Sequence, residues 1–155
     1  MRRLLGTCPW LCGWFAIAVG TLTLVAWWLN RPELTAIAAG LPPVMPNTAL
    51  MAVLQGASLI LLTPLASGKR RLLAGTLCAA AAGTIAGLTL SEWIFNLDLG
   101  IDRILLTPRE VSARAYPGRT SSETAAAYAA AAVALMTTNP TNARGLRPGR
   151  ILAFI

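Results

Sequence analysis

The chain contains no histidine and few acidic residues. Of its 155 residues, 6 are Asp or Glu and 13 are Lys or Arg, so that charged residues make up 12% of the sequence. Without histidine, the chain cannot hold a phosphorylated histidine, a Ser-His-Asp triad, a histidine-ligated haem or most kinds of zinc site. We therefore predict that it is not an enzyme and that it has no cofactor, metal site or catalytic residue of its own.

Hydrophobic residues, in contrast, are abundant. They make up 55% of the chain, and the mean hydropathy is +0.61, whereas soluble domains have about 25% charged residues. The net charge of +7 lies in short clusters between apolar runs. A nucleic-acid-binding domain would instead carry its basic residues on one face of a polar surface. The composition thus predicts a membrane protein with no nucleic-acid partner.

Three apolar runs are long enough to cross a bilayer as helices. About 20 apolar residues span roughly 30 Å of hydrocarbon, and residues 10–29, 48–66 and 72–91 contain no charged side chain. A fourth, alanine-rich run is shorter, but Thr120 and Glu123 have the spacing of a capping box at its start. We predict an all-α integral membrane bundle with four transmembrane helices, at about 10–29, 48–66, 72–95 and 120–138.

Basic residues are unequally divided between the two sides of such a bundle. One side has basic residues and no acid: Arg2, Arg3, Lys69, Arg70, Arg71, Arg144, Arg147 and Arg150. The other side has Arg31, Arg103, Arg109, Arg114 and Arg119 together with Glu33, Glu92, Asp98, Asp102, Glu110 and Glu123. Because cytoplasmic loops are enriched in Lys and Arg, we place both termini in the cytoplasm, in a multi-pass protein of the bacterial inner membrane that has lipid as a partner.

The first apolar run could instead be a signal peptide. The apolar core of a signal peptide has about 7 to 15 residues and precedes a cleavage site with small residues. Residues 10–29 form a longer run that ends in Trp27 and Trp28, and tryptophans are typical of the membrane interface. We therefore favour an uncleaved anchor.

The polar segments connect these predicted spans. Residues 96–119 form the longest, an outer loop where recognition is expected. Residues 139–150 are a basic tail rich in Pro, Gly and Arg, and residues 151–155 are again apolar. We interpret this last run as the first turn of a further span, and expect the chain to be a fragment of a longer protein.

Two motifs stand out at the ends of predicted spans. The first is Met45-Pro46-Asn47-Thr48-Ala49-Leu50, in which Asn47 is the expected N-cap of the second span. The second, after the third span, is Glu92-Trp93-Ile94-Phe95-Asn96-Leu97-Asp98-Leu99-Gly100-Ile101-Asp102. With Pro117-Gly118-Arg119, they resemble the multi-span N-terminal membrane region that precedes some bacterial sensor histidine kinases and diguanylate cyclases. In that family the first motif recurs after the outer loop, whereas here only Thr124 and Ala125 keep its identities, 76 positions after Thr48 and Ala49.

This resemblance implies a signal-input or anchoring module of a bacterial signal-transduction protein. Its partner would be a second copy in a homodimer or a cytoplasmic output domain, which is absent from this chain. The candidate sensing or structural residues are Pro46, Asn47, Thr48, Glu92, Trp93, Asp98, Gly100, Asp102, Pro117, Gly118 and Arg119. The alternative functions are a small transporter or pore component and a structural subunit of a membrane complex.

Individual polar residues have structural explanations as well. We expect Glu92 to lie at the outer rim and pair with an outer arginine, the alternative being a proton- or ligand-sensing group. Asp98 and Asp102 are expected to bond to nearby backbone N–H groups or to Arg103, rather than to bind a metal. Gln55, which lies in mid-span, is expected to form a hydrogen bond between helices.

The cysteines and tryptophans complete the set of candidates. Three cysteines is an odd number, and no histidine is present to complete a metal site, so we interpret the cysteines as small apolar filler. The five tryptophans lie near predicted span ends, and we interpret them as interfacial anchors: Trp10, Trp14, Trp27, Trp28 and Trp93.

Overall fold

The computed structural model describes residues 2–35, 43–63, 68–101 and 119–137, and these residues form helices and no strand. The elements are α1 (Arg2–Trp28), the 3-10 helix η1 (Pro32–Thr35), α2 (Pro46–Leu62), α3 (Lys69–Ile94) and α4 (Ser122–Thr137). The all-α prediction is therefore confirmed for the described residues, and each predicted span coincides with one helix. The largest differences are that α1 begins well before residue 10 and that α2 ends before residue 66.

Two of the described helices are long and apolar enough to cross a membrane. They are Cys8–Trp28 in α1 and Lys69–Ile94, with mean hydropathies of 1.7 and 1.6, and only 17% and 28% of their apolar windows are buried inside the protein. The helices α2 and α4 have 17 and 16 residues, or about 26 and 24 Å at 1.5 Å per residue. Length and composition thus associate α1 and α3 with a membrane, and the case for four spans continues to depend on the sequence.

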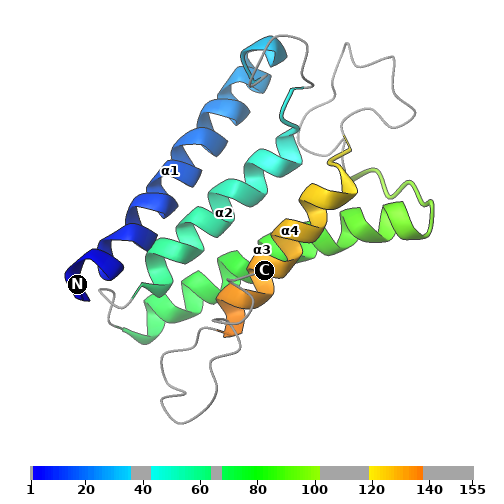
Figure 1. Ribbon diagram of the computed structural model, residues 1–155. Coiled ribbons are helices and arrows are strands. Elements are labelled where there is room, and N and C mark those ends of the chain that lie inside the picture. Colours follow the sequence, from blue (N-terminus) through cyan, green and yellow to red (C-terminus); the bar gives the residue numbers. More distant parts are fainter. Residues whose placement is uncertain (1, 36–42, 64–67, 102–118, 138–155) are drawn as a thin grey trace.

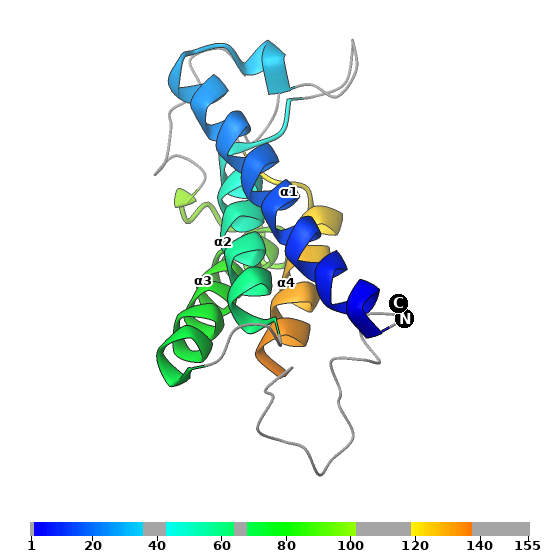
Figure 2. The ribbon, with the colours of Figure 1, turned by 90° about the vertical axis from the view of Figure 1, so that its left-hand side faces the viewer.

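Successive helices run in opposite directions, and α2 lies at the centre of the bundle (Figures 1 and 2). It packs against α1, α3 and α4, whereas α1 packs mainly against α2 and η1. No residue of α2, all of which the structure describes, is exposed. The core consists largely of alanines that are 0 or 1% exposed: Ala49, Ala79, Ala82, Ala86, Ala125 and Ala132.

Glycines bring α1 and α2 into backbone contact. A Cβ on Gly13 would lie 2.8 Å from the carbonyl oxygen of Gly56, and one on Gly20 would lie 2.6 Å from that of Ala49. A larger side chain at either position would therefore push the two helices apart. In α3, a Cβ on Gly83 would be 3.0 Å from Ala132, but around Gly87 the structure has open space. The small residues of α3 thus allow close packing, yet the tightest contact joins α1 to α2.

The starts of α2 and α4 both differ from the prediction. Asn47 is not the N-cap of α2: the cap position is Met45, and Pro46 is the first helical residue, a position that proline favours because its missing N–H is not needed there. In α4 the predicted capping box between Thr120 and Glu123 is replaced by a cap at Ser121. The Oγ of Ser121 accepts a hydrogen bond from the backbone N–H of Thr124 (3.3 Å).

The chain folds as two similar helical hairpins. The first hairpin comprises α1 and α2, and the second comprises α3 and α4. The first residues of α2 and α4, Pro46 and Ser122, are separated by the same 76 positions as Thr48 and Thr124. The helices α1 and α3, with the residues that directly follow them, share identical residues at a spacing of 66 positions: Leu11/Leu77, Cys12/Cys78, Ala16/Ala82, Leu22/Leu88, Thr23/Thr89, Leu24/Leu90, Trp27/Trp93 and Asn30/Asn96.

The two hairpins also repeat the same hydrogen bonds. The indole N–H of Trp27 donates to the carbonyl oxygen of Val44 (2.7 Å), and the indole of Trp93 donates to that of Thr120 (2.9 Å). Val44 and Thr120 each lie two residues before a helix start, so each tryptophan ties the end of one helix to the start of the next. Trp27 is consequently buried, 6% exposed, and the prediction that it is an interfacial anchor is wrong.

The C-terminal caps of α1 and α3 are also alike. Asn30 and Asn96 have φ angles of 57° and 51°, the left-handed conformation that ends many helices. After each asparagine, the next backbone N–H returns to the last turn: Arg31 donates to Ala26 (2.8 Å) and Leu97 donates to Glu92 (3.1 Å). The fold is therefore an internal repeat, and the Thr-Ala pair is the only part of it that was predicted from the sequence.

Candidate functional site: a buried polar cluster

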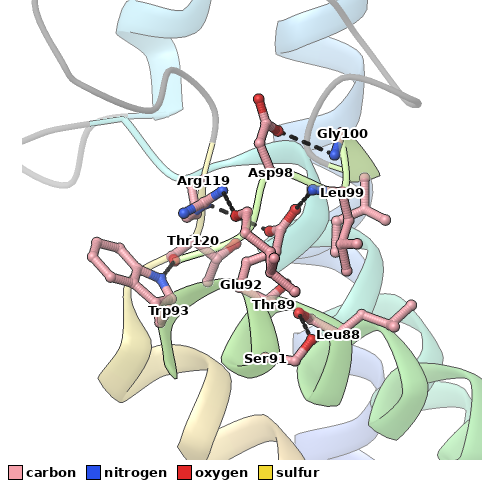
Figure 3. A network of polar contacts seen from close by, with 12 residues as sticks. Leu88, Thr89, Ser91, Glu92, Trp93, Asp98, Leu99, Gly100, Arg119 and Thr120 are labelled. Atoms are coloured by element: carbon pink, nitrogen blue, oxygen red, sulfur yellow. Dashed lines mark hydrogen bonds and ion pairs between the residues drawn. The ribbon is translucent and has the colours of Figure 1, made fainter. Parts of the chain in front are cut away.

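A polar cluster lies where the end of α3 meets the starts of α2 and α4 (Figure 3). We call Asn47, Thr48, Glu92, Trp93, Arg119 and Thr120 the Glu92 cluster. The left-handed conformation of Asn96 turns the chain back after α3, so that the following residues pass over the last turn of the helix. The backbone N–H of Leu99 can then donate a hydrogen bond to Oε1 of Glu92 (2.9 Å).

Glu92 forms an ion pair with Arg119 in the interior of the protein. The Nε atom of Arg119 lies 3.5 Å from Oε2 of Glu92, and the side chains of Arg119 and Glu92 are 2% and 0% exposed. The guanidinium also donates to the carbonyl oxygen of Leu97 (2.9 Å) and lies 5.7 Å from the ring centroid of Trp93. The predicted pairing of Glu92 with an arginine is confirmed for Arg119, and the outer location of the pair stays a prediction. The carboxylate, however, is enclosed by protein instead of lying at an open rim.

Hydrogen bonds connect this ion pair to α2. The hydroxyls of Thr48 and Thr120 lie 3.0 Å apart and share a hydrogen bond, and Trp93 bonds to the carbonyl of Thr120. The Nδ2 of Asn47 donates to the carbonyl oxygen of Ile101 at 3.4 Å. Asn47 thus binds the turn that follows α3, although the sequence suggested that it caps its own helix.

The turn after α3 is held by Asp98. Its Oδ1 accepts a hydrogen bond from the backbone N–H of Gly100 (3.2 Å), and Gly100 has a φ of 71°, which a glycine adopts without steric cost. This is the turn-type bond that was predicted for Asp98. Asp98 therefore fixes the direction of the chain that passes over Glu92.

The structure brings together candidate residues from three separate parts of the sequence. Asn47, Thr48, Glu92, Trp93 and Arg119 meet in the cluster, Pro46 begins the helix beside it, and Asp98 and Gly100 form the adjoining turn. The remaining candidates, Asp102, Pro117 and Gly118, lie outside the described residues. Sequence reasoning missed Thr120 and the backbone groups of Leu97 and Leu99. Only the Trp27/Trp93 repeat could have indicated that Thr120 accepts a hydrogen bond.

The arrangement suits mechanical coupling. Removing one partner of a buried ion pair typically costs about 3 to 5 kcal/mol, because the other charge is left without compensation. Glu92 and Arg119 come from either side of the connection between α3 and α4, so their ion pair ties the end of α3 to the residues just before α4. The cluster therefore links the positions of three helix ends.

Two further predictions concern residues away from the cluster. The Nε2 of Gln55 donates to the carbonyl oxygen of Tyr128 in α4 (2.6 Å), which confirms the predicted hydrogen bond between helices. Cys8 and Cys12 are exposed and only Cys78 is partly buried. The interpretation of the cysteines as small apolar filler stays a prediction.

Comparisons with known proteins identify no relative. No family model matches the chain, and neither a curated protein nor a solved structure does.

Proposed function

We propose that the chain is the membrane-embedded signal-input or anchoring module of a bacterial signal-transduction protein, with four spans and both termini in the cytoplasm. The observation that carries this proposal is the Glu92 cluster. It gathers residues of all three motifs on which the resemblance to sensor membrane regions rests: Asn47 and Thr48, Glu92 and Trp93, and Arg119. Because residues of the three motifs lie together in this cluster, they can act together in holding the helix ends.

In this proposal the cluster converts an event on the outer side into a displacement of helices. The C-terminal end of α3 and the starts of α2 and α4 are linked there by hydrogen bonds and one ion pair. A signal acts by binding two arrangements of these helix ends with different affinity, because only differential affinity shifts an equilibrium. Since helices are stiff, the displacement reaches their cytoplasmic ends.

The topology is tested with reporter fusions in cells. Fusions after Gly68 and Asn142 are expected to report the cytoplasm, and a fusion after Tyr116 is expected to report the outer side. A cytoplasmic result at Tyr116 would place the Glu92 cluster on the wrong side for an external signal. An outer result at Asn142 would remove the fourth span.

The signalling role is tested by identifying what the protein contacts in its native membrane. Cross-linking in cells followed by mass spectrometry should capture a kinase or cyclase output domain. Stable co-purification with a membrane complex that lacks any such domain would favour a structural subunit.

Transport is tested by flux into liposomes. The buried acid that a coupled transporter needs is present in Glu92, but here it is held by Arg119. Flux that is lost in Glu92→Gln and kept in the exposed-acid variant Glu33→Gln would contradict the signalling proposal.

A further inference from the structure

We propose that Cys8 and Cys12 together bind one soft metal ion, Cu(I), in a two-thiolate site near the start of α1. The site lies at the opposite end of the bundle from the Glu92 cluster (Figure 1). It departs from the expectation, drawn from the sequence, that the chain has no metal site. The inference does not rest on the proposed function, because it follows from the chemistry and the spacing of the two thiols.

The two thiols lie one turn apart on the same side of α1. Residues four positions apart are neighbours on a helix surface, and the side chains of Cys8 and Cys12 are in hydrogen-bond contact with each other. Both cysteines are exposed. Cys8 precedes the first predicted span, residues 10–29, and Cys12 lies in the first turn of that span. An ion can therefore reach both sulfurs from the membrane surface.

The spacing of the two cysteines suits a bridging ion better than a disulfide bond. The Cβ atoms of residues four apart on a helix are about 5 to 6 Å from each other, whereas a disulfide needs Cβ atoms about 3.5 to 4.5 Å apart. A direct bond between the sulfurs would therefore distort the helix. A metal ion bound to both sulfurs, with bonds of roughly 2.3 Å each, holds the sulfurs up to about 4.6 Å apart. This longer bridge fits the undistorted helix.

The number and the type of the ligands select the ion. Among the described residues, no group of three or more His, Cys, Asp or Glu side chains could hold a metal ion. A structural zinc site needs four ligands, and calcium and magnesium need oxygen ligands. Thiolates favour Cu(I), which accepts two ligands in a line.

Binding is a simple exchange of protons for the ion. Both thiol protons are released to water and the metal remains Cu(I), so no oxidant or reductant takes part. Two thiolates and one Cu(I) leave a single negative charge. The charged residues of α1 are Arg2 and Arg3, and the helix contains no acid, so the charge composition of α1 favours this product.

The internal repeat shows that the thiol pair is specific to the first hairpin. Cys12 corresponds to Cys78 of α3, but Cys8 corresponds to Ala74, 66 positions later. Cys78 is also partly buried, whereas Cys8 and Cys12 are exposed. The second hairpin thus has the same cysteine without a second thiol one turn before it. Cys78 is therefore a matched control within the same chain.

Transfer of copper from a chelator tests the proposal. The purified chain, reduced and in detergent, is added without oxygen to the coloured Cu(I) complex of bicinchoninate, and loss of colour reports transfer to the protein. We expect the chain to take up one Cu(I). Cys8→Ser and Cys12→Ser should each abolish the transfer, because one thiolate cannot hold the ion against the chelator. No transfer to the unmodified chain, or transfer that survives either substitution, would overturn the proposal.

Two control variants distinguish this pair from thiols in general. Cys78→Ser should take up copper as the unmodified chain does. The double variant Cys8→Ser/Leu11→Cys keeps three thiols but places two at adjacent positions of α1, which do not face each other. Because Leu11 is 59% exposed, the fold should tolerate this change, and thermal unfolding checks it. The folded double variant should take up no copper. Uptake equal to that of the unmodified chain, or loss of uptake in Cys78→Ser, would contradict the site.

X-ray absorption at the copper edge is an independent readout. The unmodified chain should show Cu(I) with two sulfur ligands, and an excess of Zn(II) should not displace the copper. A third sulfur ligand would contradict the two-thiolate site, because another cysteine would then have to take part. Displacement by Zn(II) would also contradict it, because a zinc site needs more ligands than this pair provides.

Discussion

The two hairpins share their architecture but differ at the Glu92 cluster. Both have a tryptophan that bonds to the carbonyl two residues before the next helix, and both have a left-handed asparagine after their first helix. The position of Glu92 in the second hairpin is occupied by Ala26 in the first, and that of Arg119 by Pro43. The first hairpin thus folds without an ion pair at this position, so the buried ion pair is a specialised feature of the second.

The largest effect is expected from removing Glu92 alone. Glu92→Ala leaves Arg119 buried without its carboxylate, which should lower the free energy of unfolding by about 3 to 5 kcal/mol. The measurement is a denaturant titration of the protein in mixed micelles. The control is Glu33→Ala, which breaks the exposed pair between Arg31 and Glu33 (3.6 Å) in the first hairpin and should cost about 1 kcal/mol or less. Similar losses in the two variants would mean that burial does not distinguish the pairs.

The next effect concerns the close contact between the backbones of α1 and α2 at Gly20, which has no glycine counterpart in the second hairpin. Gly20→Ala places a methyl group 2.6 Å from the carbonyl of Ala49, and the resulting overpacking should cost about 1 to 3 kcal/mol. In the second hairpin the equivalent position is already alanine, Ala86. The control is Gly87→Ala, which meets open space and should not destabilise the protein. A neutral Gly20→Ala variant would mean that α1 and α2 are less closely packed than described.

A smaller and nearly equal effect is expected at the two repeated tryptophans. Trp27→Phe and Trp93→Phe each remove one indole donor from a carbonyl, and each should cost about 0.5 to 1.5 kcal/mol. Thermal unfolding of the two variants in the same detergent compares them directly. If only Trp93→Phe is destabilised, the tryptophan contact is not a shared feature of the repeat.

The smallest effect is expected at Gln55. Gln55→Leu removes the hydrogen bond to the carbonyl of Tyr128, and such bonds between membrane helices contribute roughly 0.6 kcal/mol on average. The equivalent position in α4 is Ala131, so the second hairpin has no matching amide. A loss as large as that of Glu92→Ala would show that Gln55 holds the two hairpins together.

The helices could be predicted from the sequence because long uncharged apolar runs are typical of helices that pair their own backbone polar groups, as a chain must do in lipid. The ion pair was also predictable in outline, because the sequence places five arginines on the side that is predicted for Glu92. Its burial was not, because it depends on the left-handed turn at Asn96 that folds the chain back. The start of α2 lies two residues before the predicted one, because Pro46 is the first helical residue and Met45, not Asn47, is the cap.

The internal repeat was largely hidden by unequal spacing. Identities between α1 and α3 recur after 66 positions, but those between α2 and α4 recur after 76, because the connection between α3 and α4 is longer than that between α1 and α2. The second helices also share little sequence, since α4 is mostly alanine where α2 has larger apolar residues. Their equivalence was evident only from helix starts and hydrogen bonds in space.

A double-mutant cycle on Glu92 and Arg119 tests the central claim most directly. Each residue is changed to alanine, alone and together, and the free energy of unfolding is measured in the same micelles. The account predicts that the double variant is far less destabilised than the sum of the single variants, since removing both charges leaves neither one unpaired in the interior. Additive losses would contradict it, because they would mean that the two side chains do not interact in the folded protein.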